Sequence, residues 1–253
     1  MHKFTTTMIF RSVILFTTII LLIACGPAKE VDTTAGWSAV KLYRSAKSEM
    51  AKENYLTAIE RYEILESRYP FGKYATQAQL DVGYAYFKYD EPDAAIAAID
   101  RFIKINPRHE ATEYAYYLKG LVNFNRGGSI LDKIHDRDKA DYDKTILLRS
   151  YSDFQLVLRR FPRSKYAADS RQRLVFLGDM LARADLKIAR YYASREAWVA
   201  ASNRAKFIVQ NYPGTEAVKS ALEIQLTAYQ HLGLDDLAAD TKRIIELNYK
   251  DGS

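Results

Sequence analysis

Acids and histidines are the side chains that could bind a metal or move protons here, and their spacing assembles no site. Five acids crowd one short segment, as calcium ligands would: Asp132, Asp136, Asp138, Asp141 and Asp143. Ala140 stands where the calcium-loop pattern needs a ligand, and no Gly followed by Glu completes that pattern. Because lysines and arginines alternate with these acids, we interpret the segment as a solvated, self-neutralising loop, and we expect no metal and no cofactor.

Catalytic patterns are also missing from the sequence. The histidines His109, His135 and His231 lie far apart along the chain. There is no Gly-x-Ser-x-Gly, no phosphate-binding Gly-rich loop and no His-Glu-x-x-His pair. Carboxylate pairs such as Glu60 and Glu63 are predicted on exposed helix faces, whereas glycosidases need two carboxylates flanking a sugar cleft. We therefore predict no catalytic residue and a protein that is not an enzyme.

The single cysteine, Cys25, has a different chemistry, because a thiol can be acylated. It follows a basic start with Lys3 and Arg11 and an apolar run of thirteen residues, 12–24. That run is too short to span a bilayer, and it is typical of a secretory signal peptide. The residues Leu-Ile-Ala-Cys at 22–25 resemble the bacterial lipobox, in which the cysteine is acylated, with palmitate among its chains, and becomes the N-terminus. The alternative is an ordinary signal peptide that happens to contain a cysteine.

The residues around the cysteine also predict a compartment. Gly26 stands where an Asp would favour retention at the inner membrane, so we expect a lipid anchor in the outer membrane with the protein at its periplasmic face. We predict that residues 1–24 are removed and that residues 25–36 form a flexible, lipidated tether. Cleavage lowers the formal charge from +6 to +4, because Lys3 and Arg11 are lost. Acidic protein faces or lipid head groups, and not nucleic acid, suit this mild excess of cations.

Four prolines reveal an internal repeat. The pairs Tyr69-Pro70, Asn106-Pro107, Phe161-Pro162 and Tyr212-Pro213 each end a helical pattern. Twelve residues before each proline stands a small residue: Ala58, Ala95, Ser150 and Ala201. A second set of small residues stands twelve earlier in three repeats: Ala46, Gly83 and Ala189. The pattern resembles the tetratricopeptide repeat, a pair of antiparallel helices that cross closely at small residues.

The repeats predict an all-α fold, a superhelix of about five helical hairpins in one domain at 37–250. Two regular repeats are expected at 37–70 and 74–107. The third has helices at about 109–126 and 144–161, separated by an inserted loop at about 127–143. The fourth begins with a long helix at about 164–193 and continues at 196–211. A degenerate fifth pair, about 215–232 and 235–248, caps the array.

The first helices of such repeats line a concave groove, which is where binding is expected. The repeat pattern places eight aromatic or basic residues there: Tyr43, Lys47, Tyr84, Phe87, Lys88, Tyr114, Tyr117 and Phe124. Aromatic residues at helical spacing are often core residues instead, and we expect this of several. An aromatic groove with two lysines suits an extended peptide that carries aromatic side chains and a free carboxylate.

A second candidate surface is basic and lies further along the chain. Its first part surrounds the Phe161-Pro162 turn and contains Arg159, Arg160, Arg163, Lys165, Arg171 and Arg173. Its second part contains Arg195, Trp198, Asn203 and Arg204. Trp and Arg are common anchors of protein interfaces, but a purely solubilising surface is an equal alternative.

Several strings are more specific than the generic repeat. Arg-Tyr-Pro-Phe-Gly at 68–72, Ala-Ala-Ile-Asp-Arg-Phe-Ile at 97–103, Arg-Leu-Val-Phe-Leu at 173–177 and Ala-Trp-Val-Ala at 197–200, followed by Asn203-Arg204, look like those of the BamD family. These proteins are outer-membrane lipoproteins of the β-barrel assembly machinery. The resemblance covers nearly all of the chain after the predicted cleavage site. The charged loop at 127–143 departs from it, and no site is assigned there.

The resemblance implies a function and partners. It implies that the C-terminal repeats dock on the periplasmic POTRA domains of BamA, the barrel subunit, with Arg195, Trp198, Asn203 and Arg204 on that side. It implies that the N-terminal groove receives the C-terminal strand of unfolded outer-membrane proteins, and that an accessory lipoprotein such as BamC is also bound. Arg204→Glu is then expected to weaken BamA binding without unfolding the repeats.

Two other functions remain open at this point. A generic outer-membrane lipoprotein adaptor or a pilotin would share the repeats and the anchor, but it would have no reason to carry the specific strings. A helical lytic transglycosylase would need a catalytic domain, and the repeats occupy the chain.

Overall fold

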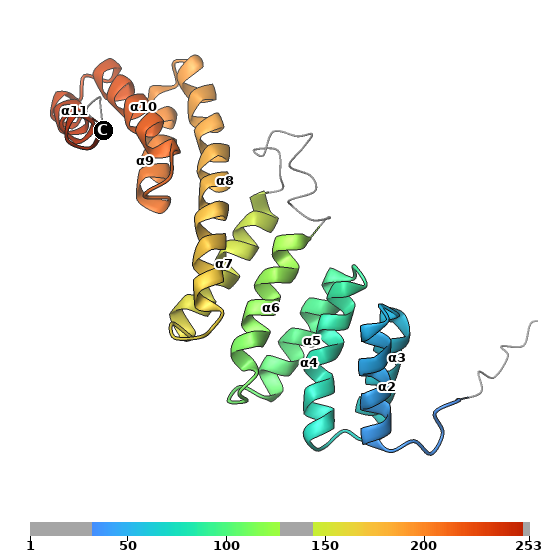
Figure 1. Cartoon of the computed structure of the whole chain (residues 1–253). Helices are drawn as coiled ribbons and strands as arrows, with labels where there is room; N and C mark the ends of the chain where they lie inside the picture. Colours follow the sequence, from blue (N-terminus) through green and yellow to red (C-terminus); the bar gives the residue numbers. More distant parts are fainter. Residues whose placement is uncertain (1–31, 127–143, 250–253) are drawn as a thin grey trace, which may run out of the picture. The chain divides into compact units, whose positions relative to one another are not determined.

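The computed structural model describes residues 32–126 and 144–249, so Cys25 and the inserted loop at 127–143 lie outside the described residues. The chain divides into two compact units, residues 1–37 and 38–253, of which the second contains the repeats. In its described part, the second unit consists of ten helices (Figure 1), and short turns join them everywhere except across residues 127–143, which lie outside the described residues. The helices form five consecutive antiparallel hairpins, which confirms the predicted all-α repeat fold.

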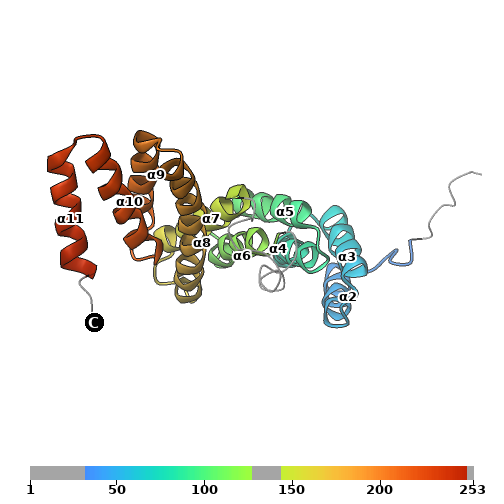
Figure 2. The ribbon, with the colours of Figure 1, turned by 90° about the horizontal axis from the view of Figure 1, so that it is seen from above.

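The helix bounds follow the predicted repeats closely. The hairpins are α2 (Ala39–Ala51) with α3 (Tyr55–Arg68), α4 (Lys73–Lys88) with α5 (Pro92–Ile105), α6 (Thr112–Asn125) with α7 (Lys144–Arg160), α8 (Ala167–Ser194) with α9 (Trp198–Asn211), and α10 (Ala217–His231) with α11 (Asp235–Tyr249). Each helix packs on its neighbours in sequence, as Figure 2 shows from above. The predicted long helix is α8, with 28 residues. It packs on α7 before it and on both α9 and α10 after it.

Small residues lie at the helix crossings, as the repeat pattern predicts. Ala46, Ala58 and Ala95 are fully buried. A Cβ atom added to Gly83 would lie 2.9 Å from Ile99 Cγ1, and one added to Gly120 would lie 2.8 Å from Phe154 Cε1. Both distances are shorter than real Cβ contacts, so these positions require glycine because the second helix of the repeat approaches so closely.

The turn inside four of the repeats has one geometry. Glu53, Asp90, Glu196 and Gly233 have positive φ angles of 62°, 63°, 56° and 67°. After each of them the next residue donates its backbone N–H five residues back, for example from Asn54 to the Glu49 carbonyl and from Leu234 to the Tyr229 carbonyl, both at 2.9–3.0 Å. This is the Schellman helix end, which satisfies the free carbonyls of the first helix. Non-glycine residues carry the left-handed conformation in three of the four turns.

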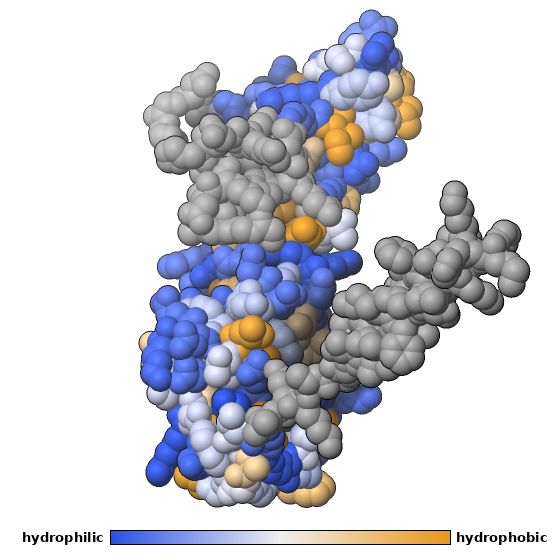
Figure 3. Space-filling view, turned by 90° about the vertical axis from the view of Figure 1, so that its right-hand side faces the viewer, coloured by the Kyte–Doolittle hydropathy of each residue, from blue (hydrophilic) through white to orange (hydrophobic). Residues whose placement is uncertain are grey.

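The core is continuous along the array. Phe102 and Ile99 centre one cluster between α4, α5 and α6, and Phe154 and Leu177 centre another that extends from α6 to α10. On the face seen in Figure 3 the surface is mainly hydrophilic, with hydrophobic residues in small separate patches. No helix in the described ranges is both long and apolar enough to cross a membrane.

Candidate functional site

A carboxylate on the second repeat organises the N-terminal end of the predicted groove. Asp81 lies on α4, its side chain is 15% exposed, and donors from three helices surround it. Tyr43 Oη and Tyr62 Oη donate to Asp81 Oδ2 over 2.9 and 3.4 Å, and Gln77 Nε2 donates to Oδ1 over 3.0 Å. Lys47 Nζ lies 3.7 Å from Oδ2. We call these five residues the Asp81 cluster; it joins the first repeat to the second.

The tyrosines of this cluster act only as hydrogen-bond donors to the acid. Burial, followed by the nearby charge of Asp81, raises the pKa of Tyr43 and of Tyr62 well above the ordinary value. Both hydroxyls therefore keep their protons at any physiological pH. Asp81 remains the only acid in contact with Lys47, so the ammonium group is partly neutralised by a residue of the protein itself.

A cavity opens beside the Asp81 cluster. It has a volume of about 380 Å³, and its lining includes both lysines predicted for the groove and two acids: Lys47, Met50, Ala51, Glu53, Tyr55, Tyr62, Asp81, Tyr84 and Lys88. Lys88 Nζ lies 5.7 Å from the centre of the Tyr55 ring, and Lys88 pairs with no acid of the described chain. Aromatic walls with one free and one partly neutralised ammonium group suit an aromatic side chain next to a carboxylate.

A second cavity lies on the other side of Tyr43. Its volume is about 470 Å³, and it is lined by Tyr43, Lys73, Tyr74, Thr76, Gln77, Asn106, His109 and Glu110. The Tyr43 ring lies against Tyr74, with ring centres 5.4 Å apart. The first cavity is lined from α2, α3 and α4, and the second from α2, α4 and the turn between α5 and α6; the hydrogen bond from Tyr43 to Asp81 joins the two linings, and we call the two cavities together the N-terminal groove.

The third repeat continues the aromatic surface, but its tyrosines contact one another. Tyr117 stacks on Tyr166 with ring centres 4.7 Å apart, and Tyr114 lies 5.5 Å from the same ring. Tyr117 Oη donates to Asp169 Oδ2 over 2.8 Å, and Arg173 Nε lies 2.6 Å from the same oxygen. Burial alone would raise the pKa of Asp169, but these two hydrogen bonds hold it below the ordinary value.

Of the eight predicted groove residues, most are at least partly accessible and two belong to the core. Lys47, Tyr84 and Lys88 are exposed, and Tyr43, Tyr114 and Tyr117 are half-buried. Phe87 packs against the core cluster between α4 and α6. Phe124 does not line the groove as predicted, because it is only 5% exposed.

The reason for the burial of Phe124 is the helix that follows. Phe154 on α7 and Phe176 on the first half of α8 pack against Phe124, with ring centres 6.3 and 5.9 Å away. The Arg173 guanidinium covers the ring at 4.7 Å. Helical spacing correctly aligned Phe124 with Tyr117, but it could not show which part of that stripe α8 covers.

Sequence reasoning missed Asp81, Tyr62, Tyr55 and Tyr74. One signal was available: Asp81 is the single acid in the stretch Ala78-Gln79-Leu80-Asp81-Val82-Gly83, in which every other residue except Gln79 is apolar or small. An acid in such a stretch is expected to have partners, because an unpaired buried charge is costly.

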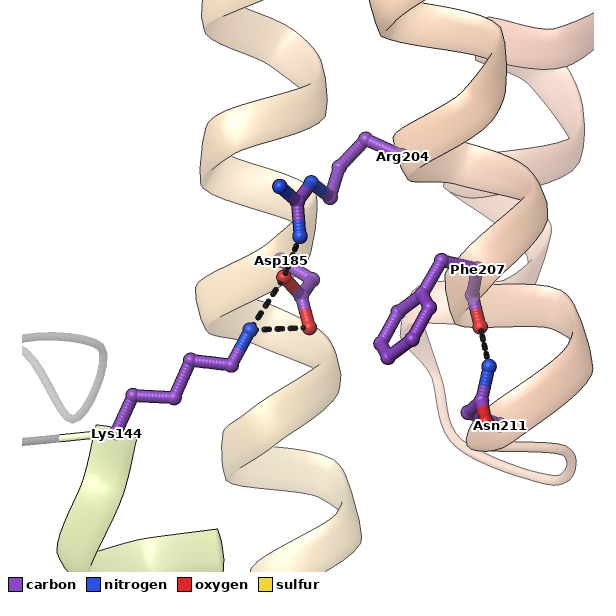
Figure 4. A network of polar contacts seen from close by, with 5 residues as sticks. All are labelled: Lys144, Asp185, Arg204, Phe207 and Asn211. Atoms are coloured by element: carbon purple, nitrogen blue, oxygen red, sulfur yellow. Dashed lines mark hydrogen bonds and ion pairs between the residues drawn. The ribbon is translucent and has the colours of Figure 1, made fainter.

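The predicted partner side contains a second acid, which is fully buried. Figure 4 shows Asp185 on α8 between Lys144 at the start of α7 and Arg204 on α9. Lys144 Nζ lies 2.7 and 2.9 Å from the two carboxylate oxygens, and Arg204 Nη1 lies 3.0 Å from Oδ1. Asp185 is 0% exposed, and the side chains of both cations are 35% exposed. Arg204 thus connects α9 to α8, and this contact argues against the expectation that Arg204→Glu leaves the repeats folded.

The other three residues of that predicted side lie on different faces. The Trp198 ring stacks on the His231 ring, with centres 4.1 Å apart and an angle of 2°. The Arg195 guanidinium lies 5.7 Å from the Tyr191 ring, and Asn203 is exposed. Trp198 therefore faces α10 and Arg204 faces α8, so the four residues do not form one continuous patch.

No cluster of three potential metal ligands exists in the part of the chain that the structure describes. The acids of the inserted loop, and Cys25, lie outside it. The two cavities of the described repeats are lined by tyrosine rings, by lysines and by the acids Glu53, Asp81 and Glu110.

Comparison with known proteins finds a family and relatives that match most of the chain. Residues 37–244 match a family model described as "YfiO: Outer membrane lipoprotein". The chain is 46% identical over 221 residues to "Outer membrane protein assembly factor BamD" of Neisseria meningitidis serogroup A, a match that covers 87% of this chain and 83% of the relative. It is 40% identical over 228 residues to the protein of the same name in Vibrio cholerae, covering 90% and 94%.

Solved structures give weaker likenesses. A crystal structure of the MamA protein covers 85% of this chain and 97% of its own, at 17% identity and a TM-score of 0.35. At that score the likeness supports no functional argument.

Proposed function

The chain belongs to the YfiO family of outer membrane lipoproteins, whose curated relatives are outer membrane protein assembly factors, and from this premise we propose that it is a scaffold that binds proteins during outer-membrane β-barrel assembly. The observation that supports binding over catalysis is the groove: two cavities, tyrosine walls and lysines, with its carboxylate fully occupied by donors.

The N-terminal groove, in this proposal, receives the C-terminal segment of an unfolded barrel protein. The aromatic side chain enters the cavity between Tyr55 and Tyr84, and the terminal carboxylate contacts Lys88 and Lys47. The rest of the peptide crosses the Tyr43 ring towards the second cavity. An accessory lipoprotein such as BamC is the competing occupant of the same groove.

The C-terminal repeats are proposed to contact the POTRA region of a BamA-type barrel protein. Arg195, Trp198 and Asn203 retain accessible atoms there, whereas Arg204 is engaged with Asp185. Cys25 is proposed to carry the lipid that anchors the protein at the periplasmic face of the outer membrane. A generic lipoprotein adaptor or a pilotin stays the alternative.

The partner is tested by affinity purification of the full-length protein in mild detergent, followed by mass spectrometry. We expect a large POTRA-containing barrel protein to dominate. Asn203→Glu, at an exposed position, is the sharper interface variant, because it does not disturb the buried Asp185 as Arg204→Glu does. Recovery of secretins or peptidoglycan-linked proteins in place of the barrel protein would replace the proposal by the adaptor alternative.

The groove is tested separately with a synthetic peptide ending in phenylalanine. Loss of a charge-assisted contact costs about 1.5–3 kcal/mol, so Lys88→Ala should weaken binding by about tenfold or more. Amidation of the peptide terminus should weaken binding to the native protein at least as much, because it removes the contacts with both lysines, and it should have a smaller further effect on the variant, in which only Lys47 remains. Lys219→Ala, at an exposed position on α10, is the matched control. Equal affinity for the free-acid and amidated peptides would refute the carboxylate contact.

A further inference from the structure

The turns that connect successive repeats lie at one edge of the array. Every first helix of a repeat begins at this edge, so the α3–α4, α5–α6 and α7–α8 turns and the start of α2 lie along the lower edge of the ribbon in Figure 1. We call the three turns, residues 69–72, 106–111 and 161–166, together with the helix ends beside them, the inter-repeat edge.

Charge is distributed unevenly between this edge and the opposite one. The three turns of the inter-repeat edge contain three cations and a single acid, Glu110. The turns inside the repeats at 52–54, 89–91 and 195–197 contain two cations and four acids. Six cations at the inter-repeat edge are exposed and form no ion pair with an acid of the described chain: Lys73, Lys104, Arg108, Arg159, Arg163 and Lys165. The fourth connecting turn, 212–216, carries Glu216 and no cation, so the basic edge ends at α8.

Large apolar side chains protrude among these cations. Phe71 is 90% exposed at the tip of the α3–α4 turn, and Ile105 is 57% exposed at the end of α5. Gly72, with a φ of 103°, lets the chain turn sharply after the ring. A single exposed apolar residue is ordinary, but a ring and an aliphatic side chain set among unpaired cations resemble surfaces that contact lipid head groups.

We propose that the inter-repeat edge lies against the surface of an anionic bilayer, with Phe71 entering the head-group region. The segment that would carry the lipid anchor joins α2 at this same edge, so the anchor holds these cations close to the membrane. Cations near an anionic surface are attracted to it, and the attraction is screened by salt. Part of the edge, Lys73 and the α5–α6 turn, also lines the second cavity, but the other turns protrude, which favours a broad lipid surface over an acidic peptide.

The test places a fluorescent probe at the edge of the full-length, lipidated protein in vesicles. Because Cys25 is the only native cysteine and its thiol is acylated in the proposed mature form, Phe71→Cys can be labelled alone. Leu56→Cys is the matched control, since Leu56 is 51% exposed at the opposite end of the hairpin, on the first turn of α3. A spin-labelled lipid in the bilayer quenches a probe that reaches the head groups.

With vesicles that contain phosphatidylglycerol, we expect quenching at position 71 to exceed quenching at position 56 several-fold. The difference should disappear at high salt, with pure phosphatidylcholine, and in the Arg163→Glu/Lys165→Glu variant. Equal quenching at the two positions would overturn the proposal, and so would a difference that persists on phosphatidylcholine. A probe at position 71 that is shielded only when the co-purified barrel protein is added would assign the edge to a protein partner instead. Flotation reports the anchor separately, and failure to float with anionic vesicles would overturn both the anchor and the edge contact.

Discussion

Asp81 and Asp185 occupy first helices of two repeats, α4 and α8, and each is contacted from two neighbouring helices, Asp81 from α2 and α3 and Asp185 from α7 and α9, yet their surroundings differ. Asp81 accepts hydrogen bonds from two tyrosines and a glutamine, has one lysine at 3.7 Å, and is 15% exposed beside a cavity. Asp185 contacts two cations at 2.7–3.0 Å and is 0% exposed.

The difference separates a site from a structural cross-link. Around Asp81, neutral donors satisfy the carboxylate and leave an ammonium group that a ligand can still approach. Around Asp185, both nearby cations form ion pairs with the acid. These pairs connect α7, α8 and α9 and leave neither cation free for a ligand. An inward-facing acid on a repeat therefore marks a binding site only where its partners are neutral and a cavity adjoins it.

The largest expected effect comes from removing the buried acid. Asp185→Ala leaves Lys144 and Arg204 facing each other without a counter-charge, and breaking a buried pair costs about 3 kcal/mol or more. We expect this loss in the free energy of unfolding, measured by urea denaturation followed by circular dichroism. Asp179→Ala is the control on the same helix, because its pair with Arg183 is partly exposed and contributes less than about 1 kcal/mol. Equal effects of the two variants would show that Asp185 is not a structural cross-link.

A substitution that changes no charge tests how closely the helices of a repeat pack. Gly120→Ala places a methyl group against the fully buried Phe154 ring, and overpacking of this kind costs about 1–3 kcal/mol, less the gain of about 1 kcal/mol in helix propensity. We therefore expect a net destabilisation of up to about 2 kcal/mol in the same denaturation experiment.

Gly178→Ala on α8 is the matched control for packing. A Cβ atom there would meet only Tyr151 Cε2, at 3.7 Å, which is an ordinary contact. This variant should be neutral or more stable than the native protein. If Gly120→Ala proved as stable as Gly178→Ala, close crossing at Gly120 would not be a constraint on the third repeat.

Asp81→Asn distinguishes the site from the cross-link most directly. The amide oxygen still accepts from Tyr43 and Tyr62, so the loss of stability should be about 1 kcal/mol or less. Lys47, however, loses its only acidic contact and becomes available to a peptide carboxylate. We expect the phenylalanine-ended peptide to bind several-fold more tightly, as measured by isothermal titration calorimetry. Weaker binding by this variant would mean that Asp81 itself contacts the peptide.

The sequence was sufficient to predict the repeats because their constraints are local and steric. Prolines end the second helices, small residues mark the crossings, and the distance between them fixes the length of each hairpin. The late second helix of the third repeat and the long α8 were both predicted from this spacing, and the structure confirms them.

The site was predicted only in part, because it depends on how far each helix covers its neighbour. Tyr43, Lys47, Tyr84 and Lys88, which were predicted for the groove, line the two cavities, whereas Phe124 is buried. Asp81 takes both tyrosine partners from the first repeat, and Asp185 takes Lys144 from the third repeat, 41 positions away, as well as Arg204 from its own, and no spacing rule predicts such pairs. The sequence motif drew attention to Arg204, but it could not show that Arg204 forms an ion pair with the buried Asp185.

A third acid, Asp153 on α7, gives the smallest expected effect. It tests whether the ionised carboxylate stabilises or destabilises the fold. Burial raises the pKa of this carboxyl, although the hydrogen bond from Asn123 Nδ2 at 2.6 Å and the charge of Lys119 oppose the shift. A carboxyl whose pKa is raised on folding stabilises the fold most below its ordinary value of 3.8, and stability falls as the pH rises through the raised pKa. Asp153→Asn keeps an oxygen for Asn123 and removes the charge. It should match or exceed the native stability at neutral pH, by less than about 0.5 kcal/mol. The difference should vanish below the ordinary pKa, and a variant less stable at neutral pH would show that the ionised carboxylate is favourable there, as it is at Asp169.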